Sequence, residues 1–305
     1  MRFGQRGVVV ITAILVVAFV ASIASFIAWQ SQLRLRQAEN LVDKSQSQAL
    51  ILAVLDWIGR ELAKDAGETS SDHLGEPWAK PISSLPVDGS LLTGAVSDQQ
   101  GLFNLNNLGR DGKAGEADLE TFRKLLTILK IPPDLSASLA DWVDADGETR
   151  MPGGAEDSDY LRQDPPYLPA NRALETVDGL YRIKGFTPEM IERLRPFVTA
   201  LPVPTSINVN TAPVEVLAAA VGELSVEQAR EVVNKRKQEH FEELGDFRVL
   251  LSKKDITLKN PNLDVKSRYF EVRGQALQGH GKAYFQALIE RRGSAAPAVI
   301  QRKIP

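Results

Sequence analysis

The 305-residue sequence contains no cysteine and only three histidines. The absence of cysteine excludes disulfide bonds and thiolate metal sites. His73, His240 and His280 lie far apart in the chain, without the spacing of metal ligands. The sequence also lacks a Gly-x-Ser-x-Gly elbow, a Walker loop and a dinucleotide-binding glycine motif. We therefore expect no catalytic activity.

An excess of positive charge is also missing. The chain has 36 lysines and arginines against 39 acidic residues, for a formal net charge of −3. A general nucleic-acid coat needs a basic surface that displaces counterions from phosphates. The weakly acidic balance argues against that class, although it allows locally basic faces.

The longest hydrophobic run lies near the N-terminus. Val8–Trp29 has no charged side chain, and it follows a polar leader that carries Arg2 and Arg6 and ends at Gly7. A secretory signal peptide is the alternative interpretation, but its apolar core usually has only ~7–15 residues before the cleavage site. A run long enough to cross a bilayer favours a retained anchor at residues 8–29. The two arginines orient the leader to the cytoplasm, so most of the chain is expected on the far side.

The hydrophobic run continues into an amphipathic stretch that contains no proline before residue 65. This pattern predicts one continuous helix over residues 8–66, half in lipid and half packed on a domain. The side chains expected to pack this helix against the domain are Leu41, Leu52, Leu55 and Leu62.

Strand-like patterns flank a long helical stretch. Alternation predicts early strands at Leu91–Ser97 and Gly101–Leu108, and a late hairpin of Arg268–Gln275 and Lys282–Arg291. The predicted helices between them are Glu116–Lys130, Pro133–Val143, Ala173–Leu180, Pro188–Thr199, Pro213–Val221 and Val226–Glu239.

Because an isolated hairpin is marginally stable, the early and late strands are expected to pair in one sheet. The fold class is therefore α+β. Residues 110–264 are expected to form a helical domain inserted into a domain made of residues 67–109 and 265–305.

Together, these features resemble the K-type minor pseudopilins of bacterial type II secretion systems. The resemblance rests on the Arg-Gly leader, the long N-terminal helix, the interrupted strands, and the segments Asp144–Tyr160 and Ser206–Ala212. It implies a type IV pilin-like fold, in which the long helix packs on a small antiparallel sheet. It also implies a large inserted all-α domain with helix-hairpin-helix-like elements.

The resemblance further implies how the chain is processed and where it works. The prepilin peptidase would cleave after Gly7 and methylate the new N-terminus at Val8, leaving a single-pass protein of the bacterial inner membrane with its bulk in the periplasm. The implied function is at the pseudopilus tip, where the protein initiates or caps fibre assembly for export across the outer membrane. The implied partners are other minor pseudopilins in a tip complex, the major pseudopilin and the prepilin peptidase, with secreted substrates or the outer-membrane secretin as further candidates.

Thr12 departs from the pattern of the wider pilin class. Most pseudopilins carry a glutamate at this fifth mature position, which pairs with the N-terminal amine of a neighbouring subunit. A carboxylate inside lipid is costly unless it is paired, so a subunit with no neighbour above it has no use for one. We expect Thr12 to mark a terminal subunit. The alternative, that its hydroxyl bonds a backbone carbonyl within the helix, is compatible with this role.

An acidic loop carries seven carboxylates between residues 144 and 164. Carboxylate oxygens suit a hard cation such as calcium, but the spacing is not that of an EF-hand. From the residues alone, a solvated acidic loop and a metal site both remain open; the resemblance implies a structural calcium site. The candidate ligands are Asp144, Asp146, Glu156 and Asp159, with Glu148, Asp157 and Asp164 as weaker candidates.

The alternative function is a membrane-anchored helix-hairpin-helix DNA receptor of an uptake system. Such modules bind phosphates through backbone N–H groups of a glycine-rich hairpin. The corresponding residues 220–225 lack the second glycine, and Glu223 places negative charge where phosphate would bind. The basic residues Lys235, Arg236 and Lys237 are surrounded by glutamates. We therefore expect no nucleic-acid partner.

Overall fold

The computed structural model describes residues 5–87, 90–112, 115–258, 260–278, 281–293 and 295–304. Residues 1–4 of the predicted leader, and Gly279 and His280 of the predicted hairpin turn, lie outside the described residues.

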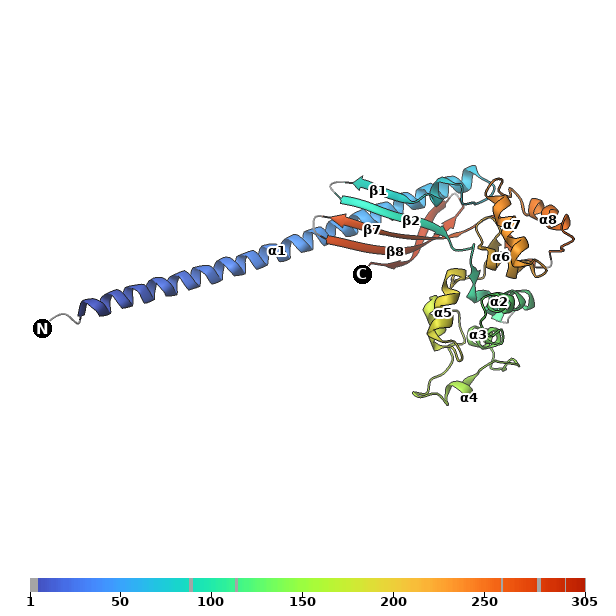
Figure 1. The fold of residues 1–305 in the computed structure, drawn as a ribbon, viewed down its shortest axis with the longest axis horizontal. Coiled ribbons are helices and arrows are strands. Elements are labelled where there is room, and N and C mark those ends of the chain that lie inside the picture. Colours follow the sequence, from blue (N-terminus) through green and yellow to red (C-terminus); the bar gives the residue numbers. More distant parts are fainter. Residues whose placement is uncertain are drawn as a thin grey trace.

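The chain begins with one long helix, α1, which runs from Gln5 to Glu68 and confirms the predicted continuous helix. Its N-terminal part extends away from the rest of the molecule, and its C-terminal part lies along a sheet (Figure 1). The helix contains an apolar window, with a mean hydropathy of 2.8, that is long enough to cross a membrane. This finding fits a membrane-spanning segment, and retention of the segment after processing stays a prediction.

A five-stranded antiparallel sheet covers the C-terminal part of α1, with strand order β1-β2-β7-β8-β9. The strands are β1 (Ile82–Val87), β2 (Ser90–Asp98), β7 (Tyr269–Gln278), β8 (Gly281–Arg292) and β9 (Ala295–Lys303). Leu92 of β2 lies opposite Ala276 of β7. The predicted pairing of early and late strands is therefore confirmed.

The two edge strands, β1 and β9, were not predicted. Pro86 lies in β1 and Pro297 lies in β9. Proline cannot donate a ladder hydrogen bond, so it weakens the sequence pattern of a strand and is tolerated at a sheet edge.

The core beneath the sheet is formed by one stripe of α1, beginning near Ser47. Leu55 and Leu62 are buried against the sheet as predicted, together with Ile51 and Ile58. The spacing of these four residues follows one helix face. Gly59 lets β9 approach, because an added Cβ would lie 2.7 Å from the ring of Pro297.

The predicted packing of Leu41 and Leu52 is wrong: their exposed fractions are 67% and 47%. Leu41 precedes the part of α1 that the sheet covers, and Leu52 points about 100° away from the adjacent buried Ile51.

The chain between β2 and β7 forms a mainly helical part with its own hydrophobic core. Its helices are α2 (Glu116–Ile128), α3 (Leu135–Val143), α4 (Asp157–Tyr160), α5 (Pro188–Leu194), α6 (Val214–Val221), α7 (Val226–Arg236) and α8 (Leu244–Ser252). Two parallel strand pairs brace it, β3 (Phe103–Asn104) with β4 (Val198–Thr199) and β5 (Ile207–Asn208) with β6 (Leu263–Asp264).

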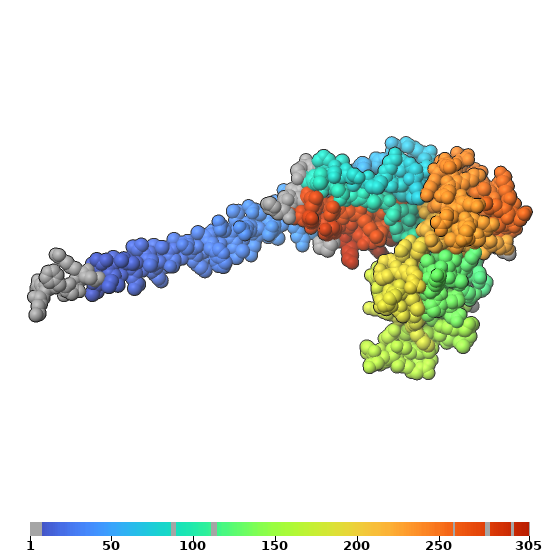
Figure 2. All heavy atoms as spheres, viewed as in Figure 1, coloured from blue at the N-terminus to red at the C-terminus, as the bar shows by residue number. Residues whose placement is uncertain are grey.

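Figure 2 shows two lobes in this helical part, with residues near 210–260 beside the sheet and residues near 115–200 projecting from it. The core of this part begins at Phe103, before the expected boundary at residue 110.

The predicted strand Gly101–Leu108 is mostly wrong. After β3 the chain turns into the 3-10 helix η2 (Leu105–Gly112). The side chain of Asn106 donates to the carbonyls of Leu174 and Leu201, at 2.9 and 2.7 Å. Asparagine side chains thus replace a strand ladder as the partners of backbone groups here.

Two predicted helices are also corrected. Ala173–Leu180 contains only the start of a 3-10 helix, η3 (Val177–Arg182). The helix predicted over Pro188–Thr199 ends at Leu194, because Pro196 disfavours continuation and is followed by β4.

Candidate functional site

The acidic loop lies around α4, at the end of the helical part farthest from the sheet (Figure 1). Three carboxylates gather there: Asp141 on α3, Asp144 at its end, and Glu156 just before α4. Asp141 and Asp144 have no exposed surface, and Glu156 is 5% exposed. Buried carboxylates at this density require compensation by hydrogen bonds, protons or cations.

Hydrogen bonds compensate only part of this charge. Asp141 Oδ2 accepts the backbone N–H groups of Arg150 and Ala155, at 3.2 and 2.9 Å. Asp141 Oδ1, Asp144 Oδ1 and both carboxylate oxygens of Glu156 accept no hydrogen bond. Four buried acceptor atoms without a hydrogen bond fit a site for a hard cation.

Arg150 is the cation that contacts this cluster. Its Nη2 lies 3.0 Å from Asp144 Oδ2, and its Nε lies 3.5 Å from Asp141 Oδ1. Burial and then the repulsion of Asp141 and Asp144 raise the pKa of Glu156 to about 7. Burial likewise raises the pKa of Asp141 to about 6. One guanidinium therefore leaves the three carboxylates with excess negative charge.

The loop is folded closely around Asp141. A Cβ at Gly154 would collide with the carboxylate of Asp141 and with the backbone of Arg150. The loop therefore needs glycine at this position to bring its backbone onto the acidic cluster.

The structure thus brings together two of the four main candidate ligands, Asp144 and Glu156, and adds Asp141. The prediction missed Asp141 because it considered only the loop that starts at residue 144. Asp141 and Asp144 are three residues apart at the end of a helix, and this spacing places their side chains on one face. The spacing was the signal in the sequence that could have identified Asp141.

The other predicted ligands lie in different surroundings. Asp146 Oδ1 accepts the N–H of Glu148 at 3.0 Å. Asp159 pairs with Lys184 at 2.8 Å and with Arg162 at 3.1 Å. The side chains of the weaker candidates are exposed: Glu148, Asp157 and Asp164.

The predicted processing and assembly residues lie at the start of α1. Gly7 and Val8 are consecutive residues of the helix, and Val8 is 60% exposed. The hydroxyl of Thr12 donates to the carbonyls of Val8 and Val9, at 3.0 and 2.9 Å. The predicted hydrogen bond within the helix is confirmed, and it leaves the proposed role at the fibre end as a prediction.

The hairpin between α6 and α7 is arranged differently from a phosphate-binding hairpin. The carbonyls of Gly222 and Leu224 accept from Lys124, the second at 3.1 Å. The N–H of Ser225 bonds the side chain of Gln228. Arg236, one of the basic residues considered for DNA, is buried and donates to the carbonyls of Val209 and Ala212. These contacts give no support to the alternative of a DNA receptor.

Two family models match this chain, at residues 101–203 and 207–266, and both are described as Type II secretion system (T2SS), protein K. The chain is 35% identical to the type II secretion system protein K of Pseudomonas aeruginosa, over 95% of this chain and 90% of that protein. It is 31% identical to the protein of the same name from Aeromonas hydrophila, over 94% and 93% of the two chains.

A solved structure also resembles this fold. It is a chain of the GspK-GspI-GspJ complex from the type 2 secretion system of enterotoxigenic Escherichia coli, with a TM-score of 0.75 and 21% sequence identity. The likeness covers 88% of this chain and 99% of that chain.

Proposed function

The chain belongs to the family of type II secretion system protein K, and from this premise we propose that it works at the tip of the pseudopilus. There, this minor pseudopilin would initiate or cap the fibre that serves protein export across the outer membrane. The observation that carries the proposal is the position of the helical part, which lies at the opposite end of the molecule from the N-terminus of α1 (Figure 1). Its bulk would block the stacking of another subunit on that side.

We propose that the apolar half of α1 anchors the chain in the inner membrane as a single pass, with the bulk in the periplasm. The prepilin peptidase would cleave between Gly7 and Val8 and methylate Val8. The uninterrupted exposure of apolar side chains from Val8 onward supports this proposal. Mass spectrometry of the protein from membranes should find a chain that starts at Val8, whereas a start near Ser25 would contradict the anchor.

Thr12 supports a position at the end of the fibre. Its hydroxyl donates to two carbonyls of its own helix. Thr12 has no negative charge that could pair with the N-terminal ammonium of a neighbouring subunit. An interior subunit would leave that ammonium without a carboxylate inside the membrane, at a high cost.

We propose that the corresponding I-type and J-type pseudopilins are the direct partners, because the solved structure that this fold resembles is the GspK-GspI-GspJ complex. The partner surface would include apolar side chains of α1 beyond the predicted anchor. Those that are exposed are Leu33, Leu35, Leu41, Val42, Leu52 and Trp57. A partner that packs along this part of the helix would remove these apolar side chains from water. The major pseudopilin would join the complex below the tip.

We propose a structural calcium site in the acidic loop, held by Asp141, Asp144 and Glu156, with Asp146 beside it. Calcium would supply the positive charge that these buried carboxylates lack. The guanidinium of Arg150 contacts two of them, so it would move aside for the ion. Asp159 is engaged by Lys184 and Arg162, and in this proposal it supports the loop rather than binding the ion.

Co-purification tests the proposed function. A tagged full-length chain, made together with the I-type and J-type proteins of the same bacterium and extracted in detergent, should retain both partners. Leu41→Asp should weaken that retention, while Glu61→Gln, on the same helix, should leave it unchanged. A wild-type chain that purifies alone under these conditions would contradict the proposal.

A further inference from the structure

A second acidic cluster lies where α1 ends, far along the chain from the acidic loop. Asp65 is in the last turn of α1, and Asp72 and Glu76 follow in the loop before β1. One oxygen from each of the three carboxylates lies within 4.8 Å of the others, and in the ranges that the structure describes no other acidic trio is this close. This cluster is independent of the calcium site proposed for the acidic loop.

The arrangement includes buried oxygens without hydrogen bonds. Asp72 is 1% exposed and Glu76 is 4% exposed. Asp72 Oδ1 and Glu76 Oε1 accept no hydrogen bond, although each carboxylate is held firmly through its other oxygen. Asp72 Oδ2 accepts from Ser267 N at 2.7 Å, and Glu76 Oε2 accepts from Trp78 Nε1 at 2.6 Å. The fixed carboxylates thus leave one oxygen each for another ligand.

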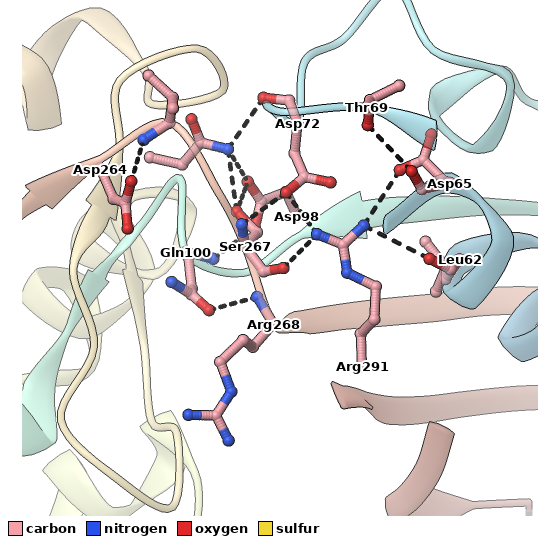
Figure 3. Close-up of polar contacts among 12 residues, drawn as sticks. Leu62, Asp65, Thr69, Asp72, Asp98, Gln100, Asp264, Ser267, Arg268 and Arg291 are labelled. Carbon is pink, nitrogen blue, oxygen red and sulfur yellow. Dashed lines mark hydrogen bonds and ion pairs between the residues drawn. The ribbon is translucent and has the colours of Figure 1, made fainter. Parts of the chain in front are cut away.

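Arg291 supplies one positive charge to this cluster and leaves Asp72 Oδ1 and Glu76 Oε1 without a hydrogen bond. Its guanidinium lies between Asp65 and Asp72 (Figure 3). It contacts the Oδ2 atoms of these residues, at 3.1 and 2.5 Å. Three carboxylates around one guanidinium leave two negative charges uncompensated in a largely buried place.

The imidazole beside the cluster does not satisfy the free oxygen of Glu76. His73 Nε2 lies 3.9 Å from Glu76 Oε1, beyond hydrogen-bond distance. Asp98, which is 7% exposed, adds a further carboxylate close by, since Ser267 donates to both Asp72 and Asp98 (Figure 3).

We infer that Asp65, Asp72 and Glu76 form a second calcium site, which clamps the end of α1 to the loop that follows it. Calcium binds oxygens at about 2.4 Å, so ligands on opposite sides of the ion lie up to ~4.8 Å apart, whereas magnesium would need them within about 4.2 Å. Asp65 is the least buried of the three and provides the route to solvent. Because Asp72 also bonds Arg291 and Ser267, the ion would stabilise the junction of helix and sheet.

Equilibrium dialysis with radioactive calcium tests this inference on the full-length chain in detergent. Glu76→Gln keeps the acceptor for Trp78 but removes the charge, and it should lower the number of bound ions by one per chain. The same loss should occur in a Glu156→Gln background, where the loop site is disabled. Glu61→Gln, an equal change of charge on the exposed side of α1, should change nothing.

This experiment tests the junction site and the loop site independently of each other. Loss of an ion with Glu76→Gln but not with Glu156→Gln would support the junction site and reject the loop site. If Glu76→Gln does not fold by near-ultraviolet circular dichroism, Asp65→Asn replaces it and should weaken binding at least about tenfold. Unchanged calcium binding in the folded variant, in both backgrounds, would overturn the inference.

Discussion

At the scale of single residues, buried polar side chains join the helical part to the sheet. Asp98, at the end of β2, accepts hydrogen bonds through Oδ2 from Asn208, Thr211 and Ser267, at 3.0, 2.5 and 2.6 Å. Asn208 also donates to the carbonyl of Asp72. A few residues thus connect the end of β2, the helical part and the loop after α1 (Figure 3).

Asp98→Ala should lower the free energy of unfolding by about 3 kcal/mol or more, because several buried donors lose their acceptor. Urea unfolding of the full-length chain in detergent, followed by near-ultraviolet circular dichroism, measures the loss. Ser97→Ala is the matched control, since Ser97 is exposed on the same strand. A loss for Asp98→Ala no larger than that of the control would contradict the structural role of this contact.

Single residues show what spacing can and cannot predict. The acidic composition of the loop pointed to Asp144 and Glu156. These two carboxylates lie close enough for the charge of Asp144 to raise the pKa of Glu156. Composition did not reveal that Asp159 faces two cations, or that Arg236 is buried with backbone partners. The burial and pairing of a side chain depend on contacts between segments that are far apart in the chain. The local spacing of residues carries no information about these contacts.

At the scale of elements, α1 is held by one stripe of side chains and leaves another exposed. Ile51→Ala should lower the free energy of unfolding by about 2–5 kcal/mol, because it opens a cavity in the core beneath the sheet. Leu41→Ala should cost less than about 0.5 kcal/mol in the isolated chain. Chemical unfolding of both variants compares them directly, and equal losses would contradict this assignment of the buried face.

The acidic loop gives a second prediction at this scale. Calcium should protect the segment between α3 and α5 from limited proteolysis, and removal of calcium with a chelator should expose it. Glu156→Gln should abolish the protection, because it removes a buried carboxylate from the proposed site. Glu148→Gln, an exposed carboxylate of the same loop, should retain it. Equal protection of wild type and Glu156→Gln would reject the assignment of Glu156 as a ligand.

Elements with a strong local pattern were predicted, and elements that depend on distant partners were not. α1, β2, β7 and β8 follow clear periodicities in the sequence. β9 contains a proline, which weakens its local strand pattern, and it forms by pairing with the edge of β8. The segment around Asn104 and Asn106 has the apolar alternation of a strand, but its side chains bond the backbone of residues 174–205.

At the scale of the whole molecule, a pilin-like body carries a helical part between two paired strands. β2 and β7 are neighbours in the sheet although about 170 residues separate them, so the sheet holds both ends of the helical part. The alternating patterns of the early and late segments predicted this interrupted architecture, since an isolated hairpin is marginally stable and needs further strands. They did not predict how the helical part divides into lobes (Figure 2).

We propose that this chain occupies the end of the fibre. Electron microscopy of pseudopili labelled with gold-conjugated antibodies against the helical part tests it most directly. The position of the helical part and the uncharged Thr12 predict a single cluster of label at one end of each fibre. Label distributed along the length of the fibres would contradict a position at the end.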